Sequence, residues 1–444
     1  MPSPWTTVKS YPADDPVRIP LAKTGSYTPH CDFIAENIPE ASPKHWYYNK
    51  YYLGNGHAQT MLASGTYTHE YPVWYGRRYF RQPDGGQFSV DYALSFVNAE
   101  PEDWQEDVKY LSDPETPRLP NRTRVLRPEE VRVLDDPSST KPLFIHLHGL
   151  TGGSHENYLR AAVCEIEREA PGAVEVAVVT ARGCNRSKIT TPQLFNAGWT
   201  DDLRLLVNHV VSTQPNRPIF LAGYSLGGAI LANYLGQEGR GVSKNIKAAI
   251  VLSAPMDLLI CHQTICSTLI GRKVYQPQMA QNLLRLVKNN RKVLETSERF
   301  RTQFAKVKGP LTVVSQFDDL FTAPLFGFSC AMEYYRQASP TLVLQDISVP
   351  TLFLTAEDDP ICGDVGVPYA EASKNPFTHI LSTTYGGHLG WFQQDGQRWF
   401  TLVMAKYTRA FLEKTDIKAA VPMPPKREMW FQNHRYGTKP PSLD

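Results

Sequence analysis

The sequence lacks the features that mark secreted, membrane-spanning and nucleic-acid-binding chains. Its opening stretch, "MPSPWTTVKSYPADDPVRIP", contains no apolar core of a secretory signal. The best apolar run, "AAIVLSAPMDLLI" at 248–260, is too short to span a bilayer and is broken by Pro255 and Asp257. The 46 Lys and Arg nearly balance 44 Asp and Glu, so a nucleic acid is not an expected partner. These absences favour an intracellular protein, either cytoplasmic or peripherally associated with a membrane or lipid droplet, and not a secreted one.

Cysteine is sparse and dispersed. The seven cysteines include no C-x-x-C pair, and an odd, scattered set is typical of reduced thiols rather than of a disulfide framework. Cys261 and Cys266 flank His262, but two thiols and one histidine without a fourth ligand do not make a zinc site. The cysteines thus do not indicate a zinc site, and we expect neither a metal nor an organic cofactor in this protein.

The 444 residues divide into three expected parts. Residues 1–70 are rich in Tyr, Pro, His and Trp, have no sustained period, and are expected to form an irregular extension packed on the core. Residues 71–420 predict an α/β domain with a helical cap inserted at about 256–345. Residues 421–444 form a Pro-rich tail.

Apolar strands alternate with amphipathic helices from residue 142 onward. A hairpin that turns at "PDGG" (83–86) comes before this alternation. Strands are expected at 142–150, 174–181, 218–225, 246–255, 349–360 and 379–388, and helices at 155–169, at 199–213, from about 227, and at 398–414. This alternation predicts a mostly parallel sheet with helices on both faces.

The stretch Gly223-Tyr224-Ser225-Leu226-Gly227 is a G-x-S-x-G motif between an apolar strand, "PIFLA", and a helical segment, "GGAILANYLGQ". A serine on such a strand–turn–helix is the arrangement of a nucleophile elbow. Small flanking residues are needed there because the serine adopts a strained backbone at a crowded turn. The alternative is a Gly-rich turn with an incidental serine.

A serine hydroxyl needs a histidine base oriented by a carboxylate, and this architecture places them in the order serine, acid, histidine. His388 follows "TTYGG" directly after an expected strand. His379 instead opens a strand pattern, and His434 lies in the Pro-rich tail. We therefore expect His388 to be the base.

Two adjacent aspartates, Asp358 and Asp359, lie in "LFLTAEDDPICG" at the end of an expected strand. The next expected strand along the chain is the one that leads to His388. Asp359 is the preferred acid because Pro360 and Ile361 follow it, a pattern common in hydrolases of this architecture. A shift of one residue in this pattern would make Asp358 the acid instead of Asp359. Asp257, after the preceding strand, is the more distant rival.

An oxyanion hole needs two N–H donors aimed at the developing negative charge. We expect one from the backbone of Leu226, directly after the nucleophile, and one from the turn "HLHGLTGG", with Leu150 preferred over Thr151. His146 and His148 could instead suggest a dinuclear metal site. Such a site requires Asp where Leu150 stands, so the metal interpretation is not favoured.

Together these motifs resemble the α/β-hydrolase superfamily, and within it the YheT-like branch. That branch includes fungal medium-chain fatty-acid ethyl ester synthase/esterases and related mammalian phospholipid-directed hydrolases. The resemblance implies a triad of Ser225, Asp359 and His388. The matching pieces are "GNGHAQT" (54–60), "HLHGLTGGSHENYLR" (146–160), "ARGCNRSKITTPQLFNAGWTDDL" (181–203), "GYSLGGAILANYLG" (223–236), "AEDDP" (356–360) and "GGHLGW" (386–391).

The resemblance also implies hydrolysis of medium-chain acyl esters through an acyl-enzyme, with acyl transfer to an alcohol as an extension of the same chemistry. The expected partners are a small-molecule or lipid ester and an alcohol acceptor. Alternatives are a monoacylglycerol or phospholipid lipase, an enzyme dedicated to one biosynthetic metabolite, and a catalytically silent binding protein of this fold. Relatives with lipid acyltransferase activity carry an H-x-x-x-x-D motif, and here Gln393 stands in place of its Asp.

Overall fold

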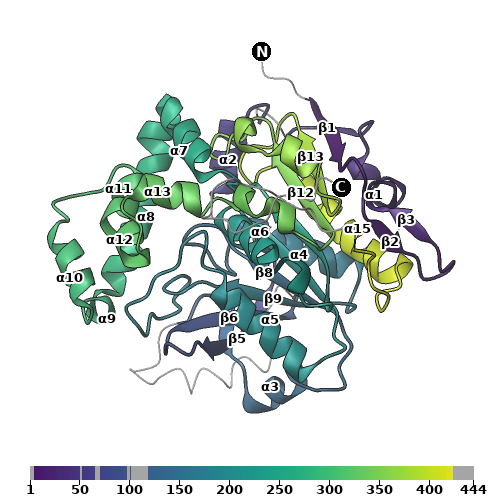
Figure 1. The fold of residues 1–444 in the computed structure, drawn as a ribbon, viewed down its shortest axis with the longest axis horizontal. Helices are drawn as coiled ribbons and strands as arrows, with labels where there is room; N and C mark the ends of the chain where they lie inside the picture. Colours follow the sequence, from purple (N-terminus) through teal and green to yellow (C-terminus); the bar gives the residue numbers. More distant parts are fainter. Residues whose placement is uncertain (1–4, 51–52, 66–70, 98–100, 102–118, 424–444) are drawn as a thin grey trace, which may run out of the picture.

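One large twisted sheet runs through the computed structural model, which describes residues 5–50, 53–65, 71–97, 101 and 119–423 (Figure 1). Within these ranges, eleven strands are joined edge to edge. In spatial order they are β4 (Trp46–Tyr48), β1 (Trp5–Pro12), β13 (Thr378–Thr383), β12 (Thr351–Ala356), β11 (Ile246–Leu252), β10 (Ile219–Tyr224), β8 (Leu143–Leu147), β9 (Glu175–Thr180), β6 (Gln87–Ser95), β5 (Trp74–Arg81) and β7 (Thr123–Val125).

The six central strands, from β13 to β9, are mutually parallel. Every residue of β8, β10, β12 and β13 is buried, as expected for parallel strands covered on both faces. The predicted hairpin forms β5 and β6, which pair antiparallel. The sheet therefore confirms the predicted α/β class.

Helices cover both faces of this sheet. On β10, Tyr224 packs against Tyr158 of α4 and Phe400 of α15, whereas a side chain at Gly223 would run into the backbone of α6. Neighbouring strand residues face opposite sides, so α6 lies on the face opposite α4 and α15. The helices outside the cap are α1 (His30–Asn37), α2 (Gly56–Ala63), α3 (Pro128–Leu134), α4 (Asn157–Glu169), α5 (Asp201–Thr213), α6 (Leu226–Glu238), α14 (Tyr369–Ala372) and α15 (Trp399–Lys414).

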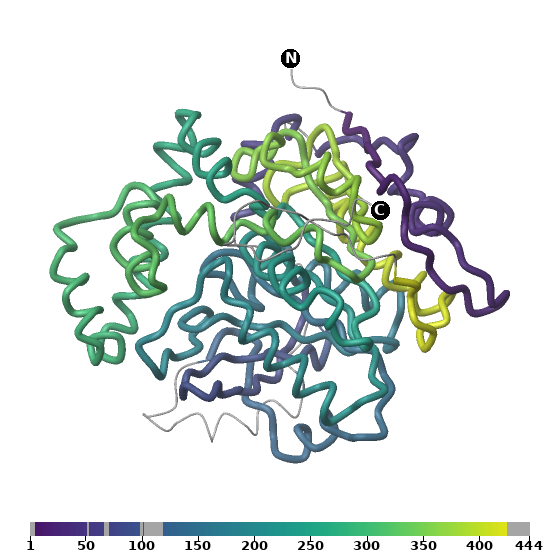
Figure 2. Tube along the Cα trace, viewed as in Figure 1, coloured from purple at the N-terminus to yellow at the C-terminus, as the bar shows by residue number. Residues whose placement is uncertain are grey.

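The amino-terminal segment is not the irregular extension that its composition suggests. Strand β1 pairs antiparallel with β13 from Val8 to Pro12, and β4 extends the sheet beyond it. A separate hairpin, β2 (Arg18–Pro20) with β3 (Tyr27–Pro29), leads into α1. In Figure 2 this purple segment lies beside the yellow carboxyl-terminal helix, where Phe33 and Phe411 pack with ring centroids 5.0 Å apart. Strand β1 carries little local signal because its partner β13 lies more than 360 residues away in the chain.

A helical insertion separates β11 from β12 and stands on the left in Figure 1. Residues 258–346 are described throughout and contain no strand. Two π-helical segments, η5 (Gly271–Tyr275) and η6 (Asp318–Thr322), interrupt it. Its helices are α7 (Leu258–Ser267), α8 (Gln276–Asn289), α9 (Arg291–Leu294), α10 (Glu298–Ala305), α11 (Val314–Phe317), α12 (Ala323–Phe326) and α13 (Ala331–Gln337). We refer to residues 258–346 as the cap.

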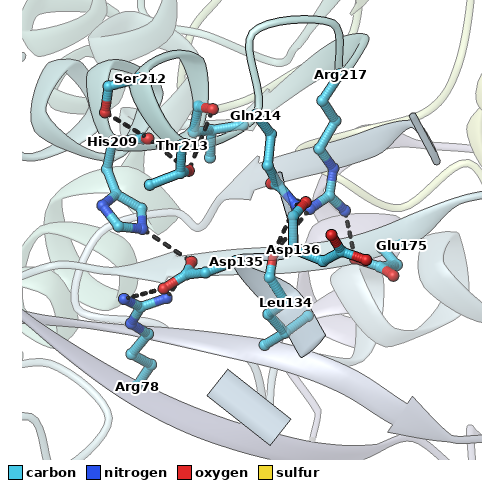
Figure 3. Close-up of polar contacts among 11 residues, drawn as sticks. Arg78, Leu134, Asp135, Asp136, Glu175, His209, Ser212, Thr213, Gln214 and Arg217 are labelled. Atoms are coloured by element: carbon cyan, nitrogen blue, oxygen red, sulfur yellow. Dashed lines mark hydrogen bonds and ion pairs between the residues drawn. The ribbon is translucent and has the colours of Figure 1, made fainter. Parts of the chain in front are cut away.

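A polar network anchors α3 to the edge of the molecule that carries β5 and α5 (Figure 3). Asp135 accepts two hydrogen bonds of 2.8 Å from Arg78 and lies 3.0 Å from His209 Nε2. Gln214 donates to the backbone oxygens of Leu134 and Asp136, each at 2.9 Å. The network fixes the connector that follows β7 without contributing to the site described below.

Most of the Pro-rich tail, residues 424–444, lies outside the described residues, and so does His434. Among the residues that are described, no helix is both long enough and apolar enough to cross a bilayer.

Candidate active site

Ser225 occupies a sharp turn between β10 and α6. Its φ of 52° lies in the left-handed region that side-chain-bearing residues rarely adopt, so the turn is strained. A side chain at position 223 would lie 2.4 Å from the backbone oxygen of Gly227. One at position 227 would lie 2.3 Å from the oxygen of Leu147 in β8. The two glycines of the motif are thus required by close approach, and the turn has the geometry of a nucleophile elbow.

The structure brings Ser225, His388 and Asp359 together from three separate loops at the carboxyl edge of the sheet. Nε2 of His388 lies 2.8 Å from Oγ of Ser225. Nδ1 of the same ring lies 2.9 Å from Oδ2 of Asp359. Both partners of the serine are buried, with 9% of His388 and 3% of Asp359 exposed. This chain of hydrogen bonds can deprotonate a serine hydroxyl and stabilise the resulting imidazolium.

The environment of Asp359 favours its ionised form. Its second oxygen, Oδ1, accepts the backbone N–H groups of Ile361 at 2.8 Å and Cys362 at 3.0 Å. Burial alone would raise the pKa of Asp359, but the charge and hydrogen bond of His388 and the two N–H donors hold that pKa below its usual value. The carboxylate is therefore charged where it faces the imidazole.

Asp358 faces a different part of the histidine loop. Its Oδ1 accepts the N–H groups of Gly386 and Gly387, each at 2.9 Å. Burial raises the pKa of Asp358 to about 6, and the neighbouring charge of Asp359 adds to the rise. The two N–H donors lower this pKa but do not outweigh the effect of burial. The other rivals are engaged elsewhere: Asp257 caps α7 by accepting the N–H of Ile260, and His379 pairs with Ser10 within the sheet.

The turn after β8 lies against the serine. A side chain at Gly149 would be 3.3 Å from Cβ of Ser225, and the N–H of Gly149 is taken by the hydroxyl of Tyr158. Leu150 and Leu226 both line the pocket that Ser225 enters. Within the described part of the chain, neither of their N–H groups has an intramolecular acceptor. Two free donors beside a nucleophile are what a developing oxyanion requires.

His146 in β8 and His148 in the turn after it each have a hydrogen-bond partner of their own. His146 Nδ1 lies 3.0 Å from the hydroxyl of Tyr224, and His148 Nε2 accepts the N–H of Ala181 at 3.1 Å. Burial lowers the pKa of His146 to about 3 and that of His148 to about 4, so both rings are neutral. Their hydrogen-bond partners differ, and among the described residues neither ring belongs to a group of three or more potential metal ligands.

Another set of potential metal ligands coincides with the histidine site. Asp359, Cys362 and His388 place ligand atoms within 4.8 Å of one another. His388 Nδ1, however, already pairs with Asp359, and its Nε2 pairs with Ser225. The hydrogen-bonded arrangement thus uses the same nitrogen atoms that a metal would require.

A pocket with an empty volume of about 950 Å³ opens beside Ser225. Leu150 and Leu226, which flank the serine turn, line this pocket together with residues of the cap. The cap contributes mainly apolar side chains, among them Leu258, Ile265, Met279, Leu283, Leu286 and Phe317. Such a lining can take a flexible hydrocarbon chain. Sequence patterns placed the cap but named none of these pocket residues, because their convergence depends on helix packing.

The motif "GNGHAQT" also reaches this site, although the sequence alone gave it no role. It forms the start of α2, and Oγ1 of Thr60 accepts the backbone N–H of His388 at 2.8 Å. The signal in the sequence that could have pointed to a functional role was a motif rich in glycine and amide side chains, far from the serine along the chain. Only the tertiary structure shows which loop it contacts.

A parallel sheet with a serine elbow at its carboxyl edge defines the α/β-hydrolase class. Comparison with known proteins supports the same class. A family model described as serine aminopeptidase, S33, matches residues 177–324. A monoacylglycerol lipase of Saccharomyces cerevisiae is 38% identical over 375 residues, covering 83% of this chain and 82% of the relative.

Two further relatives extend the comparison. The medium-chain fatty acid ethyl ester synthase/esterase 2 of Saccharomyces cerevisiae is 33% identical, over 82% of this chain and 85% of its own. The phospholipase ABHD3 of Mus musculus is 28% identical, over 82% and 75% of the two chains. The chain therefore belongs to the α/β-hydrolase superfamily, in its YheT-like branch.

Proposed function

We propose that the chain is a serine hydrolase that cleaves carboxylic esters through an acyl-enzyme on Ser225. Oγ of Ser225 attacks the ester carbonyl carbon while its proton passes to Nε2 of His388. The N–H groups of Leu226 and Leu150 stabilise the tetrahedral oxyanion. His388 then returns the proton to the departing alcohol as the ester C–O bond breaks. Asp359 holds the imidazole in the required tautomer. The continuous hydrogen bonding from Ser225 through His388 to Asp359 carries this proposal.

The second half-reaction reverses the proton transfers. His388 takes a proton from an incoming water or alcohol, whose oxygen attacks the acyl carbon, and the proton returns to Ser225 as the acyl–enzyme bond breaks. Water yields a free acid, and an alcohol yields a new ester. The synthase/esterase relative supports including alcohol transfer in the proposal.

The acyl group is proposed to be a medium-length fatty chain. The apolar cap side of the pocket provides a suitable surface, and the three relatives are named for activity on esters of lipids or fatty acids. A monoacylglycerol lipase is the second candidate, supported by the relative with 38% identity. Comparing nitrophenyl esters, ethyl esters, monoacylglycerols and phospholipids of equal chain length separates the candidates.

Ser225→Ala tests the nucleophile. It is expected to abolish hydrolysis of a medium-chain nitrophenyl ester and to prevent covalent labelling by a fluorophosphonate probe. Ser212→Ala is the matched control, because Ser212 is an exposed serine on α5 whose hydroxyl donates to the backbone oxygen of His209 (Figure 3). Undiminished turnover by Ser225→Ala contradicts the proposal. A wild-type protein that neither labels nor cleaves any ester of the panel favours a silent binding protein instead.

A further inference from the structure

The loop that carries His388 is held by side chains from outside it. Asp358, two residues after the end of β12, accepts the N–H groups of Gly386 and Gly387, each at 2.9 Å. Thr60 of α2 accepts the next N–H in line, that of His388, at 2.8 Å. Three consecutive backbone donors are thus bound by two side chains from opposite ends of the sequence.

Helix α2 contacts the same loop at a second point and at close range. Gln59 Oε1 accepts the N–H of Phe392 at 3.0 Å, while its Nε2 donates to the oxygen of Leu53 at 3.0 Å. A side chain at Gly387 would lie 2.4 Å from the backbone oxygen of Gly56, and Gly387 has a φ of 56°. Only glycine allows the loop to approach the helix this closely.

The orientation of Thr60 is itself fixed. Its hydroxyl donates at 2.6 Å to the oxygen of Gly56, one turn earlier in α2, so a lone pair of Oγ1 faces the N–H of His388. Thr60 is 4% exposed and Gln59 is fully buried, so water cannot replace either of them easily. Loss of one of these acceptors would leave a buried loop N–H without a partner.

We propose that Thr60, Gln59 and Asp358 are positioning residues for His388 and that the "GNGHAQT" motif serves this purpose. The inference rests on the proposed serine-hydrolase function. These residues act through the loop backbone rather than on the imidazole, and they set where Nε2 lies relative to Oγ of Ser225. A displacement of about 1 Å in a reacting group can cost about 10²-fold in rate.

Thr60→Val tests the inference because valine keeps the shape of threonine and removes the acceptor. We expect kcat for a medium-chain nitrophenyl ester to fall by about 10- to 100-fold, with KM changed by less than about twofold. The rate of fluorophosphonate labelling at Ser225 should fall in parallel. Thr60→Ser restores the hydroxyl and should recover most of the activity.

Thr408→Val is the matched control. Thr408 of α15 is also buried and also donates to the oxygen one helical turn earlier, that of Met404, but its hydroxyl makes no contact with the histidine loop. Both variants therefore lose one intrahelical bond. Only Thr60→Val should lose kcat, and the downfield proton resonance of His388 should shift or broaden only in that variant.

Asp358→Ala provides an independent measurement where Thr60→Val folds poorly. It should lower kcat about tenfold or more, and Asp358→Asn, which keeps an acceptor oxygen, should lower it less. The inference is overturned when folded Thr60→Val or Asp358→Ala retains wild-type kcat, or when Thr408→Val loses as much activity as Thr60→Val. A wild-type enzyme without Ser225-dependent turnover would instead overturn the proposed function.

Discussion

Asp358 and Asp359 are adjacent in the chain but bind different groups of one loop. Asp359 accepts from the imidazole of His388 at 2.9 Å, whereas Asp358 accepts two backbone N–H groups that precede this histidine. Their pKa values move in opposite directions, downward for Asp359 beside the imidazole and upward to about 6 for Asp358. One carboxylate thus orients the ring, and the other holds the backbone that carries it.

This difference predicts unequal effects of the two amide substitutions. Asp359→Asn should lower kcat by on the order of 10⁴-fold, because an amide cannot hold the required tautomer or stabilise the imidazolium. Asp358→Asn should lower kcat by less than about tenfold, because its amide oxygen can still accept both N–H groups. Steady-state hydrolysis of a nitrophenyl ester measures both. Equal losses would show that the roles are not divided in this way.

Asp358 should also shape the pH dependence of stability. Because burial raises its pKa from the ordinary value of 3.8 to about 6, the folded chain holds a proton in this window that the unfolded chain has released. Its contribution to the free energy of unfolding therefore falls as pH rises from about 4 to about 6. Asp358→Asn should gain stability relative to wild type across that window in urea unfolding. Parallel pH curves for the two proteins would contradict the prediction.

Arg77 and Arg78 face opposite sides of β5, and their ion pairs should contribute unequally to the free energy of unfolding. Arg77 and Asp91 are both fully buried, and Asp91 also accepts a hydrogen bond from Ser154, close to the turn after β8. Asp91→Asn leaves the Arg77 charge unpaired and should lower the free energy of unfolding by about 3–5 kcal/mol. Asp135→Asn, which breaks the partly exposed pair with Arg78, should cost about 1 kcal/mol or less. Urea denaturation compares the two, and a larger loss for Asp135→Asn would reverse the ranking.

The cap side of the pocket should set acyl-chain length. Leu283 lines the pocket, so Leu283→Trp fills space that a long chain would occupy. We expect kcat/KM for the longest nitrophenyl esters of a series from acetate to laurate to fall by about tenfold more than for the shortest. Leu269→Trp is the control, because Leu269 is 67% exposed and is not part of the pocket lining. An equal loss at every chain length would place the substrate elsewhere.

Local patterns predicted much of the fold. The central strands are continuous apolar runs, and α5 and α15 show helical spacing, so these elements follow from the sequence within a few residues. Strand β1 could not be predicted in this way, because its eight residues show only a weak alternation of apolar and polar side chains and are stabilised by pairing with β13. That partner lies more than 360 residues away, and no local window contains both.

Short stretches of sequence contain the strand, turn and helix signals that predict the turn at Ser225, and they place the candidate serine, acid and histidine in that order along the chain. Sequence patterns favoured Asp359 over Asp358, but the pairing of Asp359 with His388 and the contact of Thr60 with the histidine loop are seen only in the tertiary structure. The tertiary structure also determined which cap residues line the pocket. Those relationships depend on distances between segments far apart in the chain, which are fixed by packing around the sheet rather than by local propensity.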